Sequence, residues 1–342
     1  MEKFPSDDRE DAYTELGEGS IHSFLRQIEV HPERWGSVAF FSEEWRTYLF
    51  EENFAITTFH YEIVDYFVSG EVTHSYREPR NVEGPVWDAE TKVSGGSVVA
   101  ITSGTEAHHK QINYVEKIPA HYFRLWIIPW KLDMKPRCNW IIPKQRDRPP
   151  GFLTLVSPWK GGPVEGSERK GDLNPTIKGS IPIESDTAVG VGFVEPGETI
   201  YWTAGDFDEE RQDKRRKVFV QVIMTKASQT MTSLRGDGID FCTARDKAYE
   251  ASSTTKIRLD GREEMELSEG DGAFLHAMKM GDRLAVENVG EGKVEVLIFD
   301  TTYHEPPIPW YFSHSKDAMA WRLGEDILEW TGDDDDHEDK AA

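Results

Sequence analysis

Residues 56–74 read ITTFHYEIVDYFVSGEVTH, and this stretch gives the clearest indication of the fold class. Its apolar run at residues 63–68 has the length of a strand, and it ends at Gly70-Glu71, a pair suited to a tight turn. A second short run then returns toward His74. This order of strand, glycine turn and strand predicts a β-hairpin.

Apolar runs of the same length recur along the chain, bounded by Gly, Pro, Asn or Asp; examples are GGSVVAITSG, YFRLWIIPW, VFVQVIMT and DRLAVENVGEGKVEVLIFD. Many short strands separated by turn residues are typical of barrels and sandwiches. The helical signal is confined to residues 43–50 and 317–330. The sequence therefore predicts a mainly β protein.

Two parts of the chain share one layout, which predicts a barrel built twice. The turn at Gly70-Glu71 is followed by GGSVV at residues 95–99, and the turn at Asp260-Gly261 is followed by GDGAF at residues 270–274. We expect a flexible N-terminal segment at residues 1–18, followed by an N-terminal barrel that carries the function at residues 19–150. A degenerate C-terminal barrel is expected at residues 151–312, a C-terminal helix at residues 313–330 and an acidic disordered tail at residues 331–342.

The charge balance excludes one large class of partners. The chain has 342 residues, with 39 Lys and Arg against 62 Asp and Glu, for a formal net charge of −23 at pH 7. Nucleic-acid binding depends on cations that neutralise phosphates, so we expect no direct contact with DNA or RNA, and no binding to anionic membranes. The expected partners are a small-molecule substrate, another protein, or a second copy of the chain in a homodimer.

Cysteine use and the N-terminus bear on the compartment. Cys138 and Cys242 form no redox or metal-binding motif, so we expect both to be structural. Residues 1–10 lack the apolar core of a signal peptide, and no run reaches the ~18 apolar residues that a membrane-spanning helix needs. These features predict a soluble protein in a reducing compartment, the cytoplasm, with the nucleus left open.

Several short motifs follow one another in a set order. Glu62 is followed by seven residues, by Gly70-Glu71 and by His74. This order resembles the first barrel of the pirin-like bicupins, including the quercetinase-type members, which has His-x-His-x-x-x-Glu, seven further residues, Gly-Glu and then a His. The family continues with a Gly-Asp-Val strand, a Thr-Ala-Gly turn and a metal-binding His; this chain has GSV at residues 96–98, TSG at 102–104 and then His108-His109.

Further motifs keep the family's order: Leu125-Trp126, Pro129, Pro136-Arg137 and the closing strand at residues 295–300. Each motif is weak alone, and their shared order and spacing make the resemblance. It implies two cupin (jelly-roll) barrels in tandem.

The resemblance also implies a metal site in the first barrel, and the sequence departs from it there. The two family histidines fall on Ile56 and Thr58, which are poor ligands or none. His109 matches the third ligand, whereas Gln111 stands where the family has an acidic residue.

Three interpretations of this altered site stay open. Alternation along a strand would put Thr58, His60 and Glu62 on one face, so His60, Glu62 and His109 could form a shifted site for iron or another divalent transition metal. Without a metal, a desolvated Glu62 beside His109 could act as a general acid or base. The same residues could also be a purely structural polar interior.

Alternation places Tyr66 on the same face as Glu62, so Tyr66 is expected to line the cavity and bind substrate, as are four further residues: Ile56, Thr58, Gln111 and Trp126. The expected function is that of an enzyme acting on a small aromatic or polyketide-like molecule, either a metal-dependent dioxygenase or a metal-free isomerase, cyclase or lyase. The rival is a non-catalytic binding or co-regulator protein. An open barrel interior would favour the enzyme, and a filled one would favour the rival.

Overall fold

The computed structural model describes the parts of the chain at residues 1–4, 10–13, 19–23, 35–46, 56–58, 60–77, 89–116, 118–130, 134–141, 151–160, 174–206, 215–240, 243–244, 247–248 and 255–304. The expected C-terminal helix and acidic tail lie outside the described residues, and the expected domain limits stay predictions. Two parts of the segment that we expected to be flexible form strands, β1 at Glu2–Phe4 and β2 at Glu10–Tyr13.

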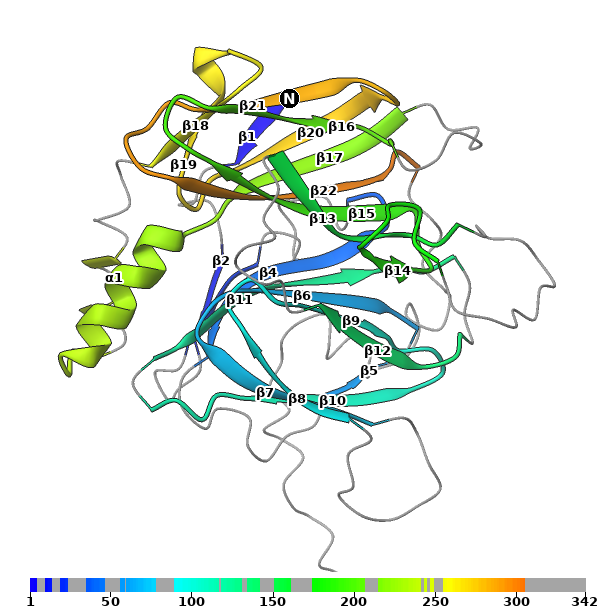
Figure 1. Cartoon of the computed structure of the whole chain (residues 1–342), viewed down its shortest axis with the longest axis vertical. Coiled ribbons are helices and arrows are strands. Elements are labelled where there is room, and N and C mark those ends of the chain that lie inside the picture. The colour runs from blue at the N-terminus through cyan, green and yellow to red at the C-terminus, as the bar shows by residue number, and fades with distance from the viewer. Residues whose placement is uncertain are drawn as a thin grey trace, which may run out of the picture.

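The first barrel consists of a seven-stranded and a four-stranded sheet (Figure 1). The strands of the larger sheet are, in order, β12 (Arg137–Ile141), β9 (Val98–Thr102), β6 (Glu62–Ser69), β11 (Ala120–Ile127), β4 (Val38–Arg46), β3 (Gly19–Ser23) and β2 (Glu10–Tyr13). Those of the smaller sheet are β5 (Ile56–Thr58), β10 (Ala107–Ile112), β7 (Glu71–Arg77) and β8 (Ala89–Ser94).

The second barrel repeats this plan. The strands of its seven-stranded sheet are, in order, β1 (Glu2–Phe4), β20 (Gly272–Lys279), β17 (Arg215–Val222), β22 (Val294–Thr302), β15 (Thr187–Val194), β13 (Gly151–Pro158) and β14 (Ile181–Ile183). Those of its four-stranded sheet are β16 (Thr199–Thr203), β21 (Arg283–Asn288), β18 (Lys256–Leu259) and β19 (Glu266–Ser268). The prediction of a mainly β protein with a barrel built twice is confirmed.

The turn at Gly70 corrects the hairpin prediction. Strand β6 pairs with β9 and β11 in the larger sheet, whereas β7 pairs with β8 and β10 in the smaller one. The chain therefore changes sheets at Gly70, which has φ +78° and whose added Cβ would lie 2.6 Å from the backbone of Ala120. A left-handed backbone this close to another strand requires glycine.

Helical structure is sparse in the described residues. Helix α1, Thr225–Gly236, lies beside the junction of the two barrels and packs its buried Met231 in a group with Trp45 of β4 (Figure 1). A 3₁₀ turn, η4, covers Glu263–Met265. The helix expected from residue 43 is wrong for residues 43–46, which belong to β4. No helix in the described part of the chain is long and apolar enough to cross a membrane.

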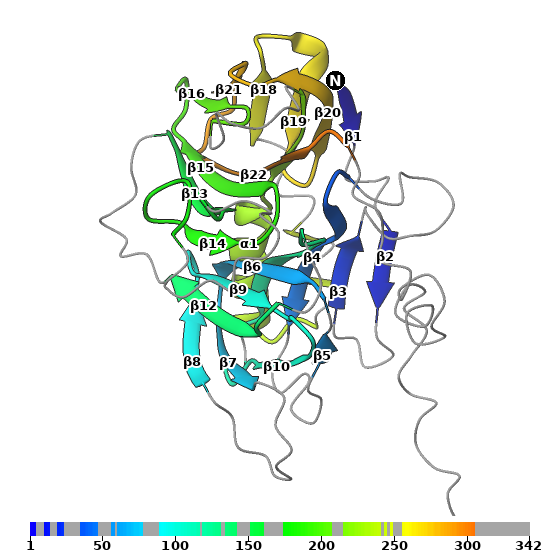
Figure 2. The same ribbon diagram turned by 90° about the vertical axis from the view of Figure 1, so that its right-hand side faces the viewer.

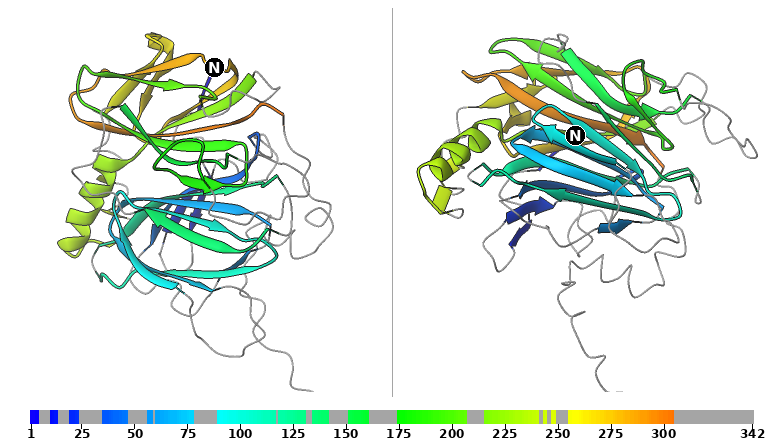
Figure 3. Two further views of the ribbon diagram at one scale, coloured as in Figure 1. Left: turned by 45° about the vertical axis from the view of Figure 1, so that its right-hand side comes forward. Right: turned by 60° about the horizontal axis from the view of Figure 1, so that its bottom comes forward.

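The two seven-stranded sheets face each other, and the four-stranded sheets lie on the outside (Figures 2 and 3). Their facing sides share one apolar core, in which Phe41 of the first barrel meets Phe219 and Phe299 of the second at centroid distances of 5.8 and 5.4 Å. Each barrel also has an interior core of its own.

Strand β6 is therefore buried on both faces. Val64 and Tyr66 belong to the core between the barrels, whereas Ile63 and Phe67 belong to the interior of the first barrel. Successive side chains on a strand alternate, so Asp65 points into the first barrel and Glu62 points toward the second.

Candidate functional site

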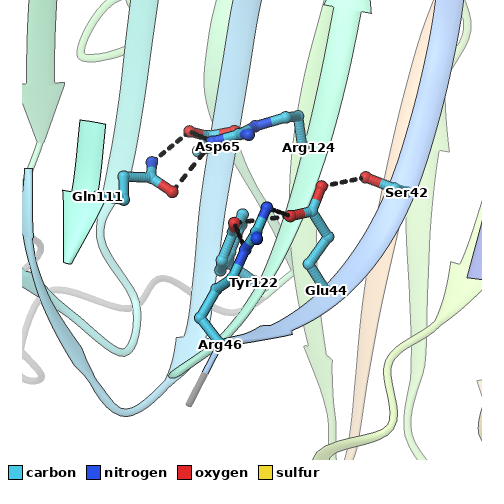
Figure 4. A network of polar contacts seen from close by, with 7 residues as sticks. All are labelled: Ser42, Glu44, Arg46, Asp65, Gln111, Tyr122 and Arg124. Atoms are coloured by element: carbon cyan, nitrogen blue, oxygen red, sulfur yellow. Dashed lines mark hydrogen bonds and ion pairs between the residues drawn. The ribbon is translucent and has the colours of Figure 1, made fainter. Parts of the chain in front are cut away.

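The interior of the first barrel holds a closed triangle of polar side chains from three strands (Figure 4). Arg124 of β11 donates from Nε to Oδ1 of Asp65 on β6 at 2.8 Å and from Nη2 to Oδ2 at 3.0 Å. Gln111 of β10 donates from Nε2 to Oδ2 of Asp65 at 2.6 Å and accepts from Nη2 of Arg124 at 3.0 Å. All three residues are buried. The side-chain amide of Gln111 thus hydrogen-bonds to both members of the Arg124–Asp65 ion pair.

A second ion pair lies beside the first (Figure 4). Arg46 donates to Glu44 at 2.7 Å, and the hydroxyl of Tyr122 donates to the same carboxylate oxygen at 2.7 Å while accepting from Nε of Arg46. Ser42 donates to the other oxygen of Glu44. Burial alone would raise the pKa of Glu44, but Arg46, Arg124 and these hydrogen bonds lower it to about 2. Glu44 is therefore ionised under physiological conditions.

Two histidines complete the described interior. The rings of His74 on β7 and His109 on β10 are nearly parallel, with centroids 6.0 Å apart and 26° between their planes. Both are about 1% exposed. Burial, with the positive charge of Arg124 nearby, lowers the pKa of His74 to about 3 and the pKa of His109 well below 6.5. Both imidazoles are therefore neutral.

The ring nitrogens of these histidines contrast with the ion pairs. Neither Nδ1 nor Nε2 of His109, nor Nε2 of His74, has a hydrogen-bond partner among the described residues. By contrast, no buried polar side-chain atom of the seven residues drawn in Figure 4 lacks a hydrogen-bond partner. Buried polar atoms are normally bonded, and exceptions mark a bound water, ion or ligand, or a catalytic role.

Glu62 does not take part in this interior. Its Oε1 accepts the backbone N–H of Glu184, a residue of the second barrel, at 2.9 Å, and its Oε2 accepts the hydroxyl of Thr102 at 2.7 Å. Burial raises the pKa of Glu62 to about 7 against the lowering effect of Arg137 and these bonds. The expected acid–base pair of Glu62 with His109 is wrong, because the two residues lie on opposite sides of β6.

The expected metal ligands are not brought together either. Strand β5 ends at Thr58, and His60 lies in a bend at φ +55° with its N–H bonded to the carbonyl of Gly104. The alternation that would align Thr58, His60 and Glu62 is therefore broken. No three His, Cys, Asp or Glu side chains among the described residues are grouped so that they could hold a metal ion.

The expected substrate-binding residues fall in different places. Tyr66 does share a face with Glu62, but this face meets the second barrel, where the Tyr66 hydroxyl donates to Glu295. Gln111 is in the barrel interior as expected. Half-buried Trp126 packs against the interior core, with its ring 5.2 Å from that of Tyr61.

Ile56 and Thr58 are placed by the ladder of β5 with β10. Ile56 lies opposite His109, and Thr58 lies opposite Ala107. The strand that would supply ligands next to His109 therefore contributes an isoleucine and a threonine at those positions.

A divalent transition metal does not fit this set of donors. Structural and catalytic sites use three or more imidazole, thiolate or carboxylate ligands. The donors here are two imidazoles, since both oxygens of Asp65 are bonded to Arg124 and Gln111 presents a neutral amide.

Sequence reasoning missed the residues that dominate the interior: Asp65, Arg124, Glu44 and Arg46. A signal for the first two was present. Asp65 is the one charged residue within EIVDYFVS after its first position, and Arg124 is the one charged residue within YFRLWII. A lone acid in one apolar strand and a lone base in another point to a buried pair, because an unpaired buried charge is too costly.

Comparisons with known proteins give the fold its name. A scan against protein-family models finds no match, and a search of curated proteins finds none. Among solved structures, the bacterial pirin YhhW from Escherichia coli in complex with nickel(II) superposes with a TM-score of 0.57 at 15% identity, covering 88% of this chain and 98% of that chain. A quercetin 2,3-dioxygenase from Acinetobacter baumannii superposes with a TM-score of 0.57 at 11% identity, covering 95% of this chain and 94% of that chain. The chain has the fold of the pirin-like bicupins, with two cupin barrels in tandem.

Proposed function

We propose that the first barrel binds a small organic molecule and transfers a proton through His109 without a metal ion. The observation that carries this proposal is the pair of buried ring nitrogens of His109, which bond to none of the described residues. A buried polar group left unbonded costs about 1–3 kcal/mol. A ligand that satisfies these nitrogens would recover that free energy.

The neutral state of His109 leaves one of its ring nitrogens available to accept a proton. A neutral imidazole has one N–H donor and one free acceptor nitrogen, so it can take a proton from an acidic C–H or O–H group and return it to another atom. The guanidinium of Arg124 stabilises negative charge that develops on the substrate, because Coulomb interactions are strong in a dry interior. This chemistry belongs to isomerases, cyclases and lyases.

Aromatic side chains near the interior favour a planar substrate. The Trp126 ring packs between Tyr61, at a centroid distance of 5.2 Å, and Phe40, at 5.9 Å. All three are half-buried. Such rings offer stacking surfaces to an aromatic or polyketide-like molecule, whose enolisable positions match the proposed chemistry.

The metal-dependent alternative receives less support from this chain. The names of two structural neighbours mention nickel and quercetin dioxygenation. Dioxygenation of that kind would need a bound metal, and the imidazole pair beside a compensated carboxylate does not fit one. The residues present favour metal-free proton transfer.

The test is hydrogen exchange at an acidic C–H of a probe. The probe is 1-phenylbutane-1,3-dione in D₂O, followed by proton NMR with and without protein. We expect catalysed exchange that is lost in His109→Ala. The matched control is His108→Ala, because His108 is the next residue, is half-buried and pairs with Glu106 at 2.9 Å. No catalysed exchange with the wild type, or equal exchange with His109→Ala, would contradict the proposal.

A second candidate, a non-catalytic binding protein, is favoured by one observation. The interior core of the first barrel has ten buried hydrophobic residues, each at most 4% exposed: Ile63, Phe67, Val72, Tyr76, Val93, Val99, Ile101, Ala107, Ala120 and Tyr122. A filled interior suits a scaffold, and the net charge of −23 suits a basic protein partner. The His109→Ala comparison separates the two, because a scaffold would show no exchange dependent on His109.

A further inference from the structure

We propose that Arg124 is a positioning residue of the first barrel that neutralises Asp65, keeps divalent metal ions off His74 and His109, and so fits the interior to neutral organic ligands. The ligand class rests on the function proposed above. The exclusion of metal ions does not, because it follows from the arrangement of charges alone.

The geometry of Arg124 gives it this position. Its guanidinium binds both oxygens of Asp65, at 2.8 and 3.0 Å, and also the amide oxygen of Gln111 at 3.0 Å. Arg124 is 4% exposed and Asp65 is fully buried. The same guanidinium acts electrostatically on both His74 and His109. It therefore binds the one carboxylate of the triangle and also acts on the two imidazoles.

The charges of the interior are already balanced. The guanidiniums of Arg46 and Arg124 face the carboxylates of Glu44 and Asp65. A divalent ion on two neutral imidazoles would add uncompensated positive charge in a dry interior, and the desolvation penalty there is several kcal/mol per ion. Many transition-metal sites offset that charge with an anionic ligand, a carboxylate or a thiolate. Here the carboxylate of Asp65 is already bound by Arg124.

Removing the guanidinium should reverse the preference. In Arg124→Met, a side chain of similar length carries no charge, and the carboxylate of Asp65 is released to turn toward the imidazoles. Two histidines and one carboxylate are the ligand composition suited to divalent transition metals. Arg124→Lys keeps the positive charge but loses the two-armed hydrogen bonding, so it separates the effect of charge from that of geometry.

The experiment is calorimetric titration of Ni²⁺ into untagged, chelator-treated protein. The readout is uptake that depends on His109, obtained by comparing each protein with its counterpart carrying His109→Ala. We expect no His109-dependent uptake by the wild type or by Arg124→Lys. We expect about one site per chain in Arg124→Met, with an affinity at least tenfold above any residual Ni²⁺ binding by the wild type, and the loss of this site in Arg124→Met/His109→Ala.

Three outcomes would overturn the proposal: a stoichiometric site in the wild type that is lost in His109→Ala, equal gains in Arg124→Lys and Arg124→Met, or a folded Arg124→Met without a gain. Circular dichroism shows whether Arg124→Met is folded. If it is not, Arg124→Gln, which is also uncharged and keeps hydrogen-bonding groups for Asp65, takes its place with the same expectation. Failure of the proposed function is read separately, from the exchange of the diketone probe.

Discussion

Asp65 uses both carboxylate oxygens, since Oδ1 accepts from Arg124 and Oδ2 accepts from Arg124 and Gln111. The alternation of side chains along the strand predicted that Tyr66 and Glu62 lie on one face, and this prediction is confirmed. The sequence alone could not show which face meets the barrel interior, because both faces of β6 are covered and each of them carries apolar residues.

The buried pair predicts a strong and non-additive effect on stability. Asp65→Leu leaves the Arg124 guanidinium buried without its partner, and the expected loss in the free energy of unfolding is about 3–5 kcal/mol. Asp65→Leu/Arg124→Met should lose less than the sum of the single variants by more than about 1 kcal/mol. Urea unfolding measures all three.

The exposed ion pair of Lys92 and Glu71, at 3.2 Å, is the control. Lys92→Ala should change the free energy of unfolding by no more than about 1 kcal/mol. Equal effects of Lys92→Ala and Asp65→Leu would mean that burial does not decide the strength of the pair at Asp65.

Glu62 predicts a dependence of stability on pH. Burial raises its pKa in the folded protein to about 7, above the ordinary value of 4.5. Between these values the folded state binds more protons than the unfolded state, so this contribution is present at low pH and is lost as pH rises through 7. Its full size is on the order of 3 kcal/mol, from about 1.4 kcal/mol per pKa unit.

The measurement compares the free energy of unfolding of the wild type and Glu62→Gln at pH 5 and pH 8. The difference between the two proteins should shift in favour of Glu62→Gln at pH 8, because the amide cannot ionise. A difference that stays constant across this range would show that Glu62 does not titrate as stated.

The sequence did not predict helix α1, and it predicted a helix for residues 43–46, which belong to strand β4. The two errors have related reasons. The helix has the sequence TKASQTMTSLRG, whose threonines and serines give it little intrinsic helix preference, and no side chain caps it locally. Residues 43–46 have a helical pattern but pair with β11 instead. In both cases contacts with residues distant in sequence decide the structure, and a local pattern does not record them.

The N-terminus of α1 depends on one such distant residue. The carboxylate of Glu269 accepts the backbone N–H groups of Lys226 at 2.9 Å and Ala227 at 3.2 Å. Glu269→Ala should lower the free energy of unfolding by about 1–2 kcal/mol. Hydrogen exchange at the amides of Lys226 and Ala227 should also become faster. Unchanged exchange there would contradict this role for Glu269.

In the whole molecule, strand β6 makes hydrogen bonds that join the first barrel to the second. Along one face, Glu62 accepts from the backbone of Glu184, Tyr66 donates to Glu295, and Ser69 bonds to Ser228 of α1 at 2.7 Å. The repeated layout in the sequence predicted two barrels. It did not show that their larger sheets share a core, because a repeat describes each unit and not the surface between units.

This shared core predicts cooperative unfolding. Phe299→Ala, at the centre of the core, should destabilise the protein by about 3–5 kcal/mol. It should also lower the unfolding midpoint of both barrels together, because each barrel covers an apolar face of the other. Two separate transitions, reported by hydrogen exchange at amides of β7 and of β21, would show that the barrels unfold independently.

His74 and His109 are neutral imidazoles held in a charge-balanced barrel interior. The most direct test is NMR of ¹⁵N-labelled histidine from pH 5 to pH 8, with signals assigned by His74→Ala and His109→Ala. Of the 11 histidines, the signals of these two should keep the neutral pattern throughout, since burial and Arg124 lower both pKa values far below this range. Protonation of either ring with a midpoint near 6.5 would show that the barrel interior does not keep these histidines neutral.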